Sequence, residues 1–336
     1  MRHSRCCGPG TPPCALNLKC ESMGEMEQPI NKKRVVLAGG SGFLGGLLAR
    51  ELLAQDCEVI VLSRSPRERS DGAREVEWNG THIGEWIKVL DGTDAVVNLA
   101  GRSVNCRHTP KNIFEIVESR VNSVRVLAAA LDHIAHPPRV WVQAGGIGFY
   151  GDRRDQWWCN EGTPSGEDKL AEICRQWEDA FNGVAVAKTR RVLLRIGFVL
   201  GRNGGALPVL TRLTKWFCGG AVGSGEQYIS WIHFVDLNRM FTEAIHRKDL
   251  SGTFNATAPN PAKNKEFMRE LRGVLHRPSS PRTPAWAVRV GSWLMRTEPS
   301  LALSGCRCAP KRFLDAGFKF QFPELRGALK NVCGTG

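Results

Sequence analysis

The sequence predicts a doubly wound α/β protein, in which helices cover both faces of a parallel sheet, with a smaller, mostly helical cap. Three observations carry this prediction. Short β-branched runs alternate with longer segments of helical periodicity, a glycine-rich turn follows the first run, and the alternation stops after about residue 201. Alternating strands and helices imply parallel pairing with crossover helices. Open sheets of this kind bind ligands at the carboxyl edge of their strands.

Strands are expected wherever a short apolar, β-branched run is bounded by glycine or polar residues. The first is RVVLAGG, which begins at Arg34, and further strands are expected at residues 57–64, 94–101, 139–146, 190–201 and 252–259. Helices are expected where apolar residues recur with a period near 3.6, as the leucines of FLGGLLARELLAQ do. The other helical patterns lie at 113–134, 167–181, 204–217 and, after a strand end, within 230–247. The chain after Pro259 is helical and interrupted by prolines.

Three parts are expected along the chain. Residues 1–33 are rich in proline and glycine and show no periodicity, so we expect a disordered tail or an extension upstream of a natural start near Met23 or Met26. The expected domains are the sheet domain at 34–200, completed by parts of 226–258, and the cap and C-terminal domain at 201–225 and 259–332.

Composition narrows the class of protein. The chain is 42% hydrophobic and 24% charged, as globular proteins are, and it has no apolar run of about 18 residues that could span a membrane. The net charge of +13 is explained first by solubility and second by a phosphate-bearing ligand; no motif for nucleic acid accompanies it. The 12 cysteines lack metal-ligand spacing, so we expect no metal and interpret them as reduced thiols of a cytoplasmic protein. An oligomer is left open.

The glycine-rich turn AGGSGFLG predicts a dinucleotide site. Gly39, Gly42 and Gly45 lie three apart between a predicted strand and a predicted helix. Glycines there let the backbone approach a pyrophosphate, which then lies at the helix N-terminus beside Phe43 and Leu44. A tight turn without a ligand is the simpler alternative, but the strand–turn–helix context favours the dinucleotide.

The end of the second strand favours NADP(H) over NAD(H). An NAD site usually has an acidic residue there, which accepts hydrogen bonds from the ribose hydroxyls. This strand ends in VLSRS, with Ser63 and Arg64 at that place. A guanidinium can pair with a 2′-phosphate and cannot accept a hydrogen bond. The alternative is that Arg64 is a solvated loop residue.

With these residues identified, the chain resembles the extended short-chain dehydrogenase/reductases. The shared motifs are GGSGFLG, NLAG at 98–101, ESRVNS at 118–123, RIGFVLG at 195–201 and SWIHFVDL at 230–237. More narrowly, GGALP, GSGEQYISWIH, FNATAPNP and the tail SGCRCAPKRFLDAGFKFQFPEL resemble the epimerase family proteins of an atypical branch, often called predicted nucleoside-diphosphate-sugar epimerases. The match runs from about Arg34 to Val332. It implies an NADP(H)-binding Rossmann domain, cofactor contacts at Asn98, Ala100 and Gly101, and a C-terminal domain of the branch's own.

The resemblance also shows that the usual catalytic set is missing. Extended reductases end the strand before the loop VQAGGIGFYGDRR (142–154) in Ser or Thr, and a Tyr-x-x-x-Lys follows on the next helix. The tyrosine transfers a proton, the lysine lowers its pKa and holds the ribose, and the serine orients the substrate oxygen. Here Gly145 and Gly146 replace the hydroxyl, Leu170 stands at the tyrosine position and Cys174 at the lysine position.

Other residues are candidates for the missing roles. Tyr150 and His233 are proposed as proton donors, with packing as the alternative for each, and the Cys174 thiol is a weaker candidate. Arg195 is expected to meet an anionic substrate group or, failing that, a carboxylate of the protein. Further candidates for substrate contact are Gln227, Tyr228 and Trp231, with Trp157 and Trp158 as lid residues.

The leading interpretation is an NADP(H)-binding protein of the epimerase or oxidoreductase kind that acts on an unknown small polar substrate with a degraded Ser–Tyr–Lys set. The alternative is a non-catalytic, dinucleotide-binding regulatory protein. The intact glycine loop favours ligand binding in either case, and the lost catalytic set favours the second.

Overall fold

The computed structural model describes residues 32–153 and 157–334, and the statements below concern these ranges. A seven-stranded sheet of order β11-β7-β5-β4-β1-β2-β3 forms the centre, and each neighbouring pair is parallel. Its strands are β1 (Arg34–Ala38), β2 (Glu58–Ser63), β3 (Arg74–Glu77), β4 (Ala95–Asn98), β5 (Val140–Gly146), β7 (Arg190–Ile196) and β11 (Gly252–Ala256). The predicted doubly wound sheet is confirmed.

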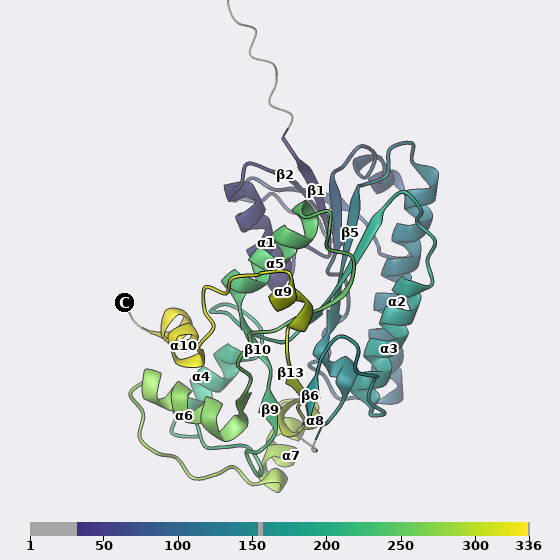
Figure 1. Cartoon of the computed structure of the whole chain (residues 1–336). Coiled ribbons are helices and arrows are strands. Elements are labelled where there is room, and N and C mark those ends of the chain that lie inside the picture. Colours follow the sequence, from purple (N-terminus) through teal and green to yellow (C-terminus); the bar gives the residue numbers. More distant parts are fainter. Residues whose placement is uncertain (1–31, 154–156, 335–336) are drawn as a thin grey trace, which may run out of the picture. The chain divides into compact units, whose positions relative to one another are not determined.

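Helices cover both faces of this sheet because its strands alternate apolar side chains between two cores. Val35 and Leu37 of β1 pack in one core with α1 (Phe43–Ala54) and α5 (Phe234–His246). Val36 and Ala38 point to the other, where α2 (Pro110–His133) and α3 (Lys169–Asn182) lie. Figure 1 shows α1 and α5 on one side of the strands and α2 and α3 on the other.

Two details differ from the sequence prediction. The strand β3, with the sequence REVE, was not among the expected strands, yet it pairs with β2 at the edge of the sheet. The run 190–201 was predicted as one strand, and this is wrong: it divides at Gly197 into β7 and β8 (Phe198–Leu200), and β8 pairs with β10 (Trp231–His233) outside the main sheet. A Cβ at Gly197 would lie 2.3 Å from the carbonyl oxygen of Ser230, so the chain crosses there too closely for a side chain.

The C-terminal part is mostly helical, as predicted. Its core joins α6 (Asn264–Val274) to α10 (Leu325–Cys333) through Phe267 and Leu329. The remaining helices there are α4 (Leu207–Lys215), α7 (Ala285–Leu294), α8 (Ser300–Leu303) and α9 (Lys311–Asp315). Short two-stranded sheets connect this part, formed by β12 (Ala262–Lys263) with β9 (Tyr228–Ile229) and by β13 (Arg307–Cys308) with β6 (Trp158–Cys159). Short 3₁₀ helices lie at η1 (Glu85–Val89) and η2 (Ile147–Tyr150).

Two further predictions concern the N-terminal tail and the membrane. The tail at 1–33 lies outside the described ranges except for its last two residues. No helix within the described ranges is long and apolar enough to cross a lipid bilayer.

Candidate functional site

The glycine loop between β1 and α1 has the geometry of an anion-binding turn. Gly39 adopts a φ of +73°, and a Cβ there would lie 2.7 Å from Ala100 Cα, so only glycine fits. A Cβ at Gly45 would lie 2.4 Å from Gly40 Cα, which explains how α1 packs so closely on the loop. Gly42 is the N-cap of α1 and offers no side-chain cap. The first N–H groups of the helix, at Phe43 and Leu44, are therefore available to a phosphate.

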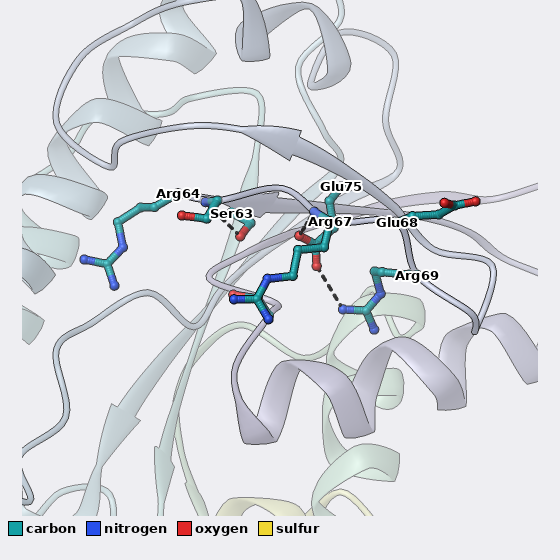
Figure 2. A pocket seen from close by; sticks show the side chains of 8 residues that line it. Ser63, Arg64, Arg67, Glu68, Arg69 and Glu75 are labelled. Atoms are coloured by element: carbon teal, nitrogen blue, oxygen red, sulfur yellow. Dashed lines mark hydrogen bonds and ion pairs between the residues drawn. The ribbon is translucent and has the colours of Figure 1, made fainter.

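A cationic pocket of about 410 Å³ lies at the end of β2, with Ser41 of the glycine loop in its wall. Figure 2 shows Arg64 beside Ser63, extending away from the Arg69–Glu75 pair. Arg69 neutralises Glu75 and also binds Asp71, whereas Arg64 has no ion-pair partner in the described part of the chain. The pocket thus presents a free guanidinium and serine hydroxyls. It is lined by Ser41, Ser63, Arg64, Ser65, Arg67, Glu68, Arg69 and Glu75.

The loop after β4 is held by a buried asparagine. The Asn98 side chain accepts from the Ala100 N–H at 3.0 Å and donates to Ser123 Oγ and Gln143 Oε1. Asn98 has no exposed surface, and protein partners use its amide. In this geometry the side chain shapes the turn at Ala100 and Gly101 that faces the glycine loop, and its cofactor contact stays a prediction.

The structure brings together Gly146, Leu170 and Cys174, the positions that the resemblance assigns to the Ser–Tyr–Lys set. A Cβ at Gly146, the end of β5, would lie 3.6 Å from Cys174 Sγ on α3, and a Cβ at Gly148 would lie 2.8 Å from Leu170 Cγ. Cys174 is buried, and burial raises the pKa of its thiol to about 12. Leu170 carries no proton to transfer. These three residues thus lie in one region, and they offer no group that titrates near neutral pH.

Tyr150 is directed into the protein. Its ring has no exposed surface, and its hydroxyl donates to Asn255 Oδ1 at 2.7 Å and accepts from Arg195 Nη1 at 2.9 Å. Burial raises the pKa of this phenol well above its usual range. Arg195 in turn binds Glu178 through Nε and Nη2 and stacks on Phe149. The geometry favours the structural alternatives for Tyr150 and Arg195, and their catalytic and substrate roles stay predictions.

His233 lies in the packing between β10, α5 and α10. It is the N-cap of α5: its Nδ1 accepts from the Val235 N–H, and its Nε2 donates to Asn331 Oδ1 at 3.1 Å. The ring is buried and stacks on Phe322 at 3.8 Å. Burial lowers the pKa of this imidazole to about 4. His233 is therefore a neutral capping residue in the geometry described, and a proton-donor role stays a prediction.

The burial of His233 predicts a pH dependence of stability. An unfolded chain binds the imidazole proton near pH 6.5 and the folded chain near pH 4, so the unfolded state gains protons first and stability falls as the pH falls through this window. Between pH 7 and pH 4, the free energy of unfolding should drop by about 3 kcal/mol more for the unmutated chain than for His233→Asn. Asparagine keeps an oxygen that can cap the helix. Urea unfolding at pH 7 and pH 4 measures this; parallel losses in both proteins would contradict it.

The candidate substrate residues on the cap make contacts within the protein. Gln227 Nε2 donates to the carbonyls of Val222 and Ala302, and the Trp231 indole donates to Asn260 O. Trp231 is fully buried, whereas Tyr228 is half-buried. The two possible lid residues, Trp157 and Trp158, are exposed, and Arg307 stacks on the Trp158 ring. These roles stay predictions.

A model described as the NAD dependent epimerase/dehydratase family matches residues 35–256. The chain belongs to this family. A second model, a domain of unknown function (DUF1731), matches residues 283–332, which hold α7, α8 and α9 and most of α10. The resemblance predicted from the sequence motifs is thereby confirmed, including the C-terminal domain.

The alignments to related proteins cover about nine tenths of this chain. It is 34% identical over 324 residues to the chloroplastic epimerase family protein SDR39U1 homolog of Arabidopsis thaliana, covering 93% of this chain and 89% of that one. It is 31% identical over 305 residues to YfhF of Bacillus subtilis, covering 89% and 97%. The human epimerase family protein SDR39U1 (isoform 2), crystallised with NADPH, is 31% identical with a TM-score of 0.79, over 89% of this chain and 98% of that chain.

Of the eight residues that line the cationic pocket, the sequence prediction named two, Ser63 and Arg64. Ser65 and Arg67 line the pocket beside Arg64. The signal was present in the sequence, because the loop SRSPRER that follows β2 is rich in serine and arginine. Of its arginines, the sequence prediction named only the first, Arg64.

Proposed function

We propose that the chain binds NADP(H) and acts slowly, if at all, as an epimerase or oxidoreductase on a small polar substrate. The observation that supports the cofactor is the cationic pocket at the end of β2, where Arg64 lacks a partner among the described residues. The human relative was crystallised with NADPH, which supports the same choice.

The residues present fit a dinucleotide phosphate. The pyrophosphate would be held by the tight turn at Gly39 and Gly42 and by the N-terminus of α1, which has no side-chain cap. Ser63 and Arg64, with Ser65 and Arg67, would hold the 2′-phosphate. When bound, NADP(H) supplies the hydride chemistry, and the protein supplies position and electrostatics.

The assignment predicts a cofactor-selective loss. Arg64→Ala should weaken NADPH binding by about 1.5–3 kcal/mol, which is the size of a charge-assisted hydrogen bond, and leave NADH nearly unchanged because NADH has no 2′-phosphate. Isothermal titration with both cofactors measures this. The exposed Arg50 of α1 provides a matched control, and Arg50→Ala should change neither affinity. Equal losses for NADPH and NADH in Arg64→Ala would remove the assignment.

A second candidate function is that of a non-catalytic, dinucleotide-binding regulatory protein. The observation that favours it is the cluster of Gly146, Leu170 and Cys174, which lacks a group that titrates near neutral pH. A thermal-shift panel of dinucleotides and nucleotide sugars separates the two. Stabilisation by NADPH together with a nucleotide sugar supports the enzyme, and stabilisation by NADPH alone supports the regulator. A cytoplasmic location and an oligomer remain predictions.

A further inference from the structure

Arg120, on α2, has no carboxylate partner among the residues that the structure describes. Its Nη1 donates to the carbonyl oxygens of Arg102 at 2.8 Å and Ile116 at 3.0 Å, and its guanidinium stacks on the Trp177 ring at 4.9 Å. In the ranges 32–153 and 157–334, it forms no ion pair, and its Nε and Nη2 groups make no hydrogen bond. Burial lowers the pKa of the guanidinium, but arginine stays charged in proteins. Placing such a charge beside apolar side chains is costly unless something compensates it.

The position of Arg120 links the cofactor loops to the degraded catalytic set. A Cβ at Gly101, in the loop after β4, would lie 3.1 Å from both Cγ and Cζ of Arg120. The preceding Ala100 packs against Gly39 of the glycine loop. Toward α3, the guanidinium stacks on the ring of Trp177, which follows three residues after Cys174 on that helix, and its charge counteracts the rise in the pKa of the Cys174 thiol. The resemblance assigns the lysine of related reductases to this position. The guanidinium therefore contacts both the loop after β4 and the helix α3 that carries the lysine position.

We propose that Arg120 supplies from α2 the positive charge that the missing lysine would supply from α3, and that its free N–H groups bind the ribose on the nicotinamide side of NADP(H). This inference rests on the proposed cofactor. The planar guanidinium can donate to two neighbouring hydroxyls at once. The neutral thiol of Cys174 fits the same arrangement, because a lysine there would place a second buried cation beside Arg120.

The rival explanation is that Arg120 only clamps the loop after β4 through Arg102 O. Two ligands distinguish the explanations: NADPH, and adenosine 2′,5′-bisphosphate, which has the 2′-phosphate but no nicotinamide ribose. In Arg120→Gln, the Kd of NADPH should rise about tenfold or more, whereas the Kd of the bisphosphate should change less than about twofold. Arg120→Lys keeps the charge and should recover part of the NADPH affinity.

Titration calorimetry of the full chain measures the Kd of both ligands for each variant. Arg125→Gln, an exposed arginine on the same helix, should leave both Kd values unchanged. Equal weakening of both ligands in Arg120→Gln identifies a clamp and overturns the inference, as does an unchanged NADPH affinity. If both Arg120 variants fail to fold by circular dichroism, the residue is structural and the inference also fails. If the unmutated chain binds neither ligand, the proposed cofactor itself is wrong.

Discussion

Replacing Glu178 with alanine is expected to lower the free energy of unfolding by about 3–5 kcal/mol, because it leaves the Arg195 guanidinium buried without a counter-charge. Both side chains are almost fully buried, with 7% of Arg195 and 4% of Glu178 exposed. Arg195 Nη2 lies 2.8 Å from Glu178 Oε2. The pair joins β7 to α3, and Arg195 also positions the Tyr150 hydroxyl. Loss of the carboxylate therefore removes the anchor of several hydrogen bonds together.

Urea denaturation followed by circular dichroism measures this loss. The matched control is Glu172→Ala on the same helix, whose carboxylate is half-exposed and pairs with Arg175. Exposed pairs contribute about 0–1 kcal/mol, so the control should barely shift the midpoint. The double variant Glu178→Leu with Arg195→Met should recover stability, since it removes both charges. A loss below about 1 kcal/mol for Glu178→Ala would show that water or another group compensates Arg195.

Turnover of NADPH by the unmutated chain is expected to stay below about 0.1 s⁻¹ on standard carbonyl and nucleotide-sugar substrates. A positioned general acid is worth about 10²–10⁴-fold, and ordinary enzymes turn over near 10 s⁻¹. Leu170 cannot supply the proton, and the raised pKa of the Cys174 thiol, about 12, keeps it a poor acid at pH 7. The Tyr150 hydroxyl is occupied by Asn255 and Arg195.

Absorbance at the NADPH band across a broad substrate panel measures this turnover. Rates near 10 s⁻¹ that survive Tyr150→Phe, Cys174→Ala and His233→Ala would place the proton donor elsewhere and contradict the expectation. Restoring Gly146→Ser, Leu170→Tyr and Cys174→Lys together is not expected to rescue activity. Leu170 packs against Gly148, where a Cβ would lie 2.8 Å from its Cγ, so the pocket has little space for a phenol ring.

The parts of the site that the sequence predicts are those built from neighbouring residues. The glycine turn and the arginine-rich end of β2 are local patterns, and both are found in the folded chain at the same edge of the sheet. The roles of Tyr150 and His233 depend on distant partners. The Tyr150 hydroxyl is bound by Asn255, 105 residues away, and the His233 ring by Asn331, 98 residues away. No local pattern shows that these polar groups are already satisfied.

The same limit explains the errors in the strands. The sequence REVE of β3 lacks the apolar run by which strands were predicted, because an edge strand needs burial on only part of its surface. The break at Gly197 depends on the close passage of Ser230, which the sequence alone does not place. Arg120 was likewise hidden inside the ESRVNS motif, since only the fold brings α2 beside Cys174.

The edge strand β11 affects the order in which this protein can be completed during synthesis. Gly252–Ala256 pairs along β7, and Asn255 of the same strand closes the contact with Tyr150. A nascent chain that has emerged only to about residue 200 therefore carries β7 as an unpaired edge, with Leu193 and Leu194 uncovered along it. Such edges pair readily with other chains. The ribosome must add more than 50 further residues before β11 can pair with this edge. The strand order therefore determines how long the nascent chain exposes an edge to other chains.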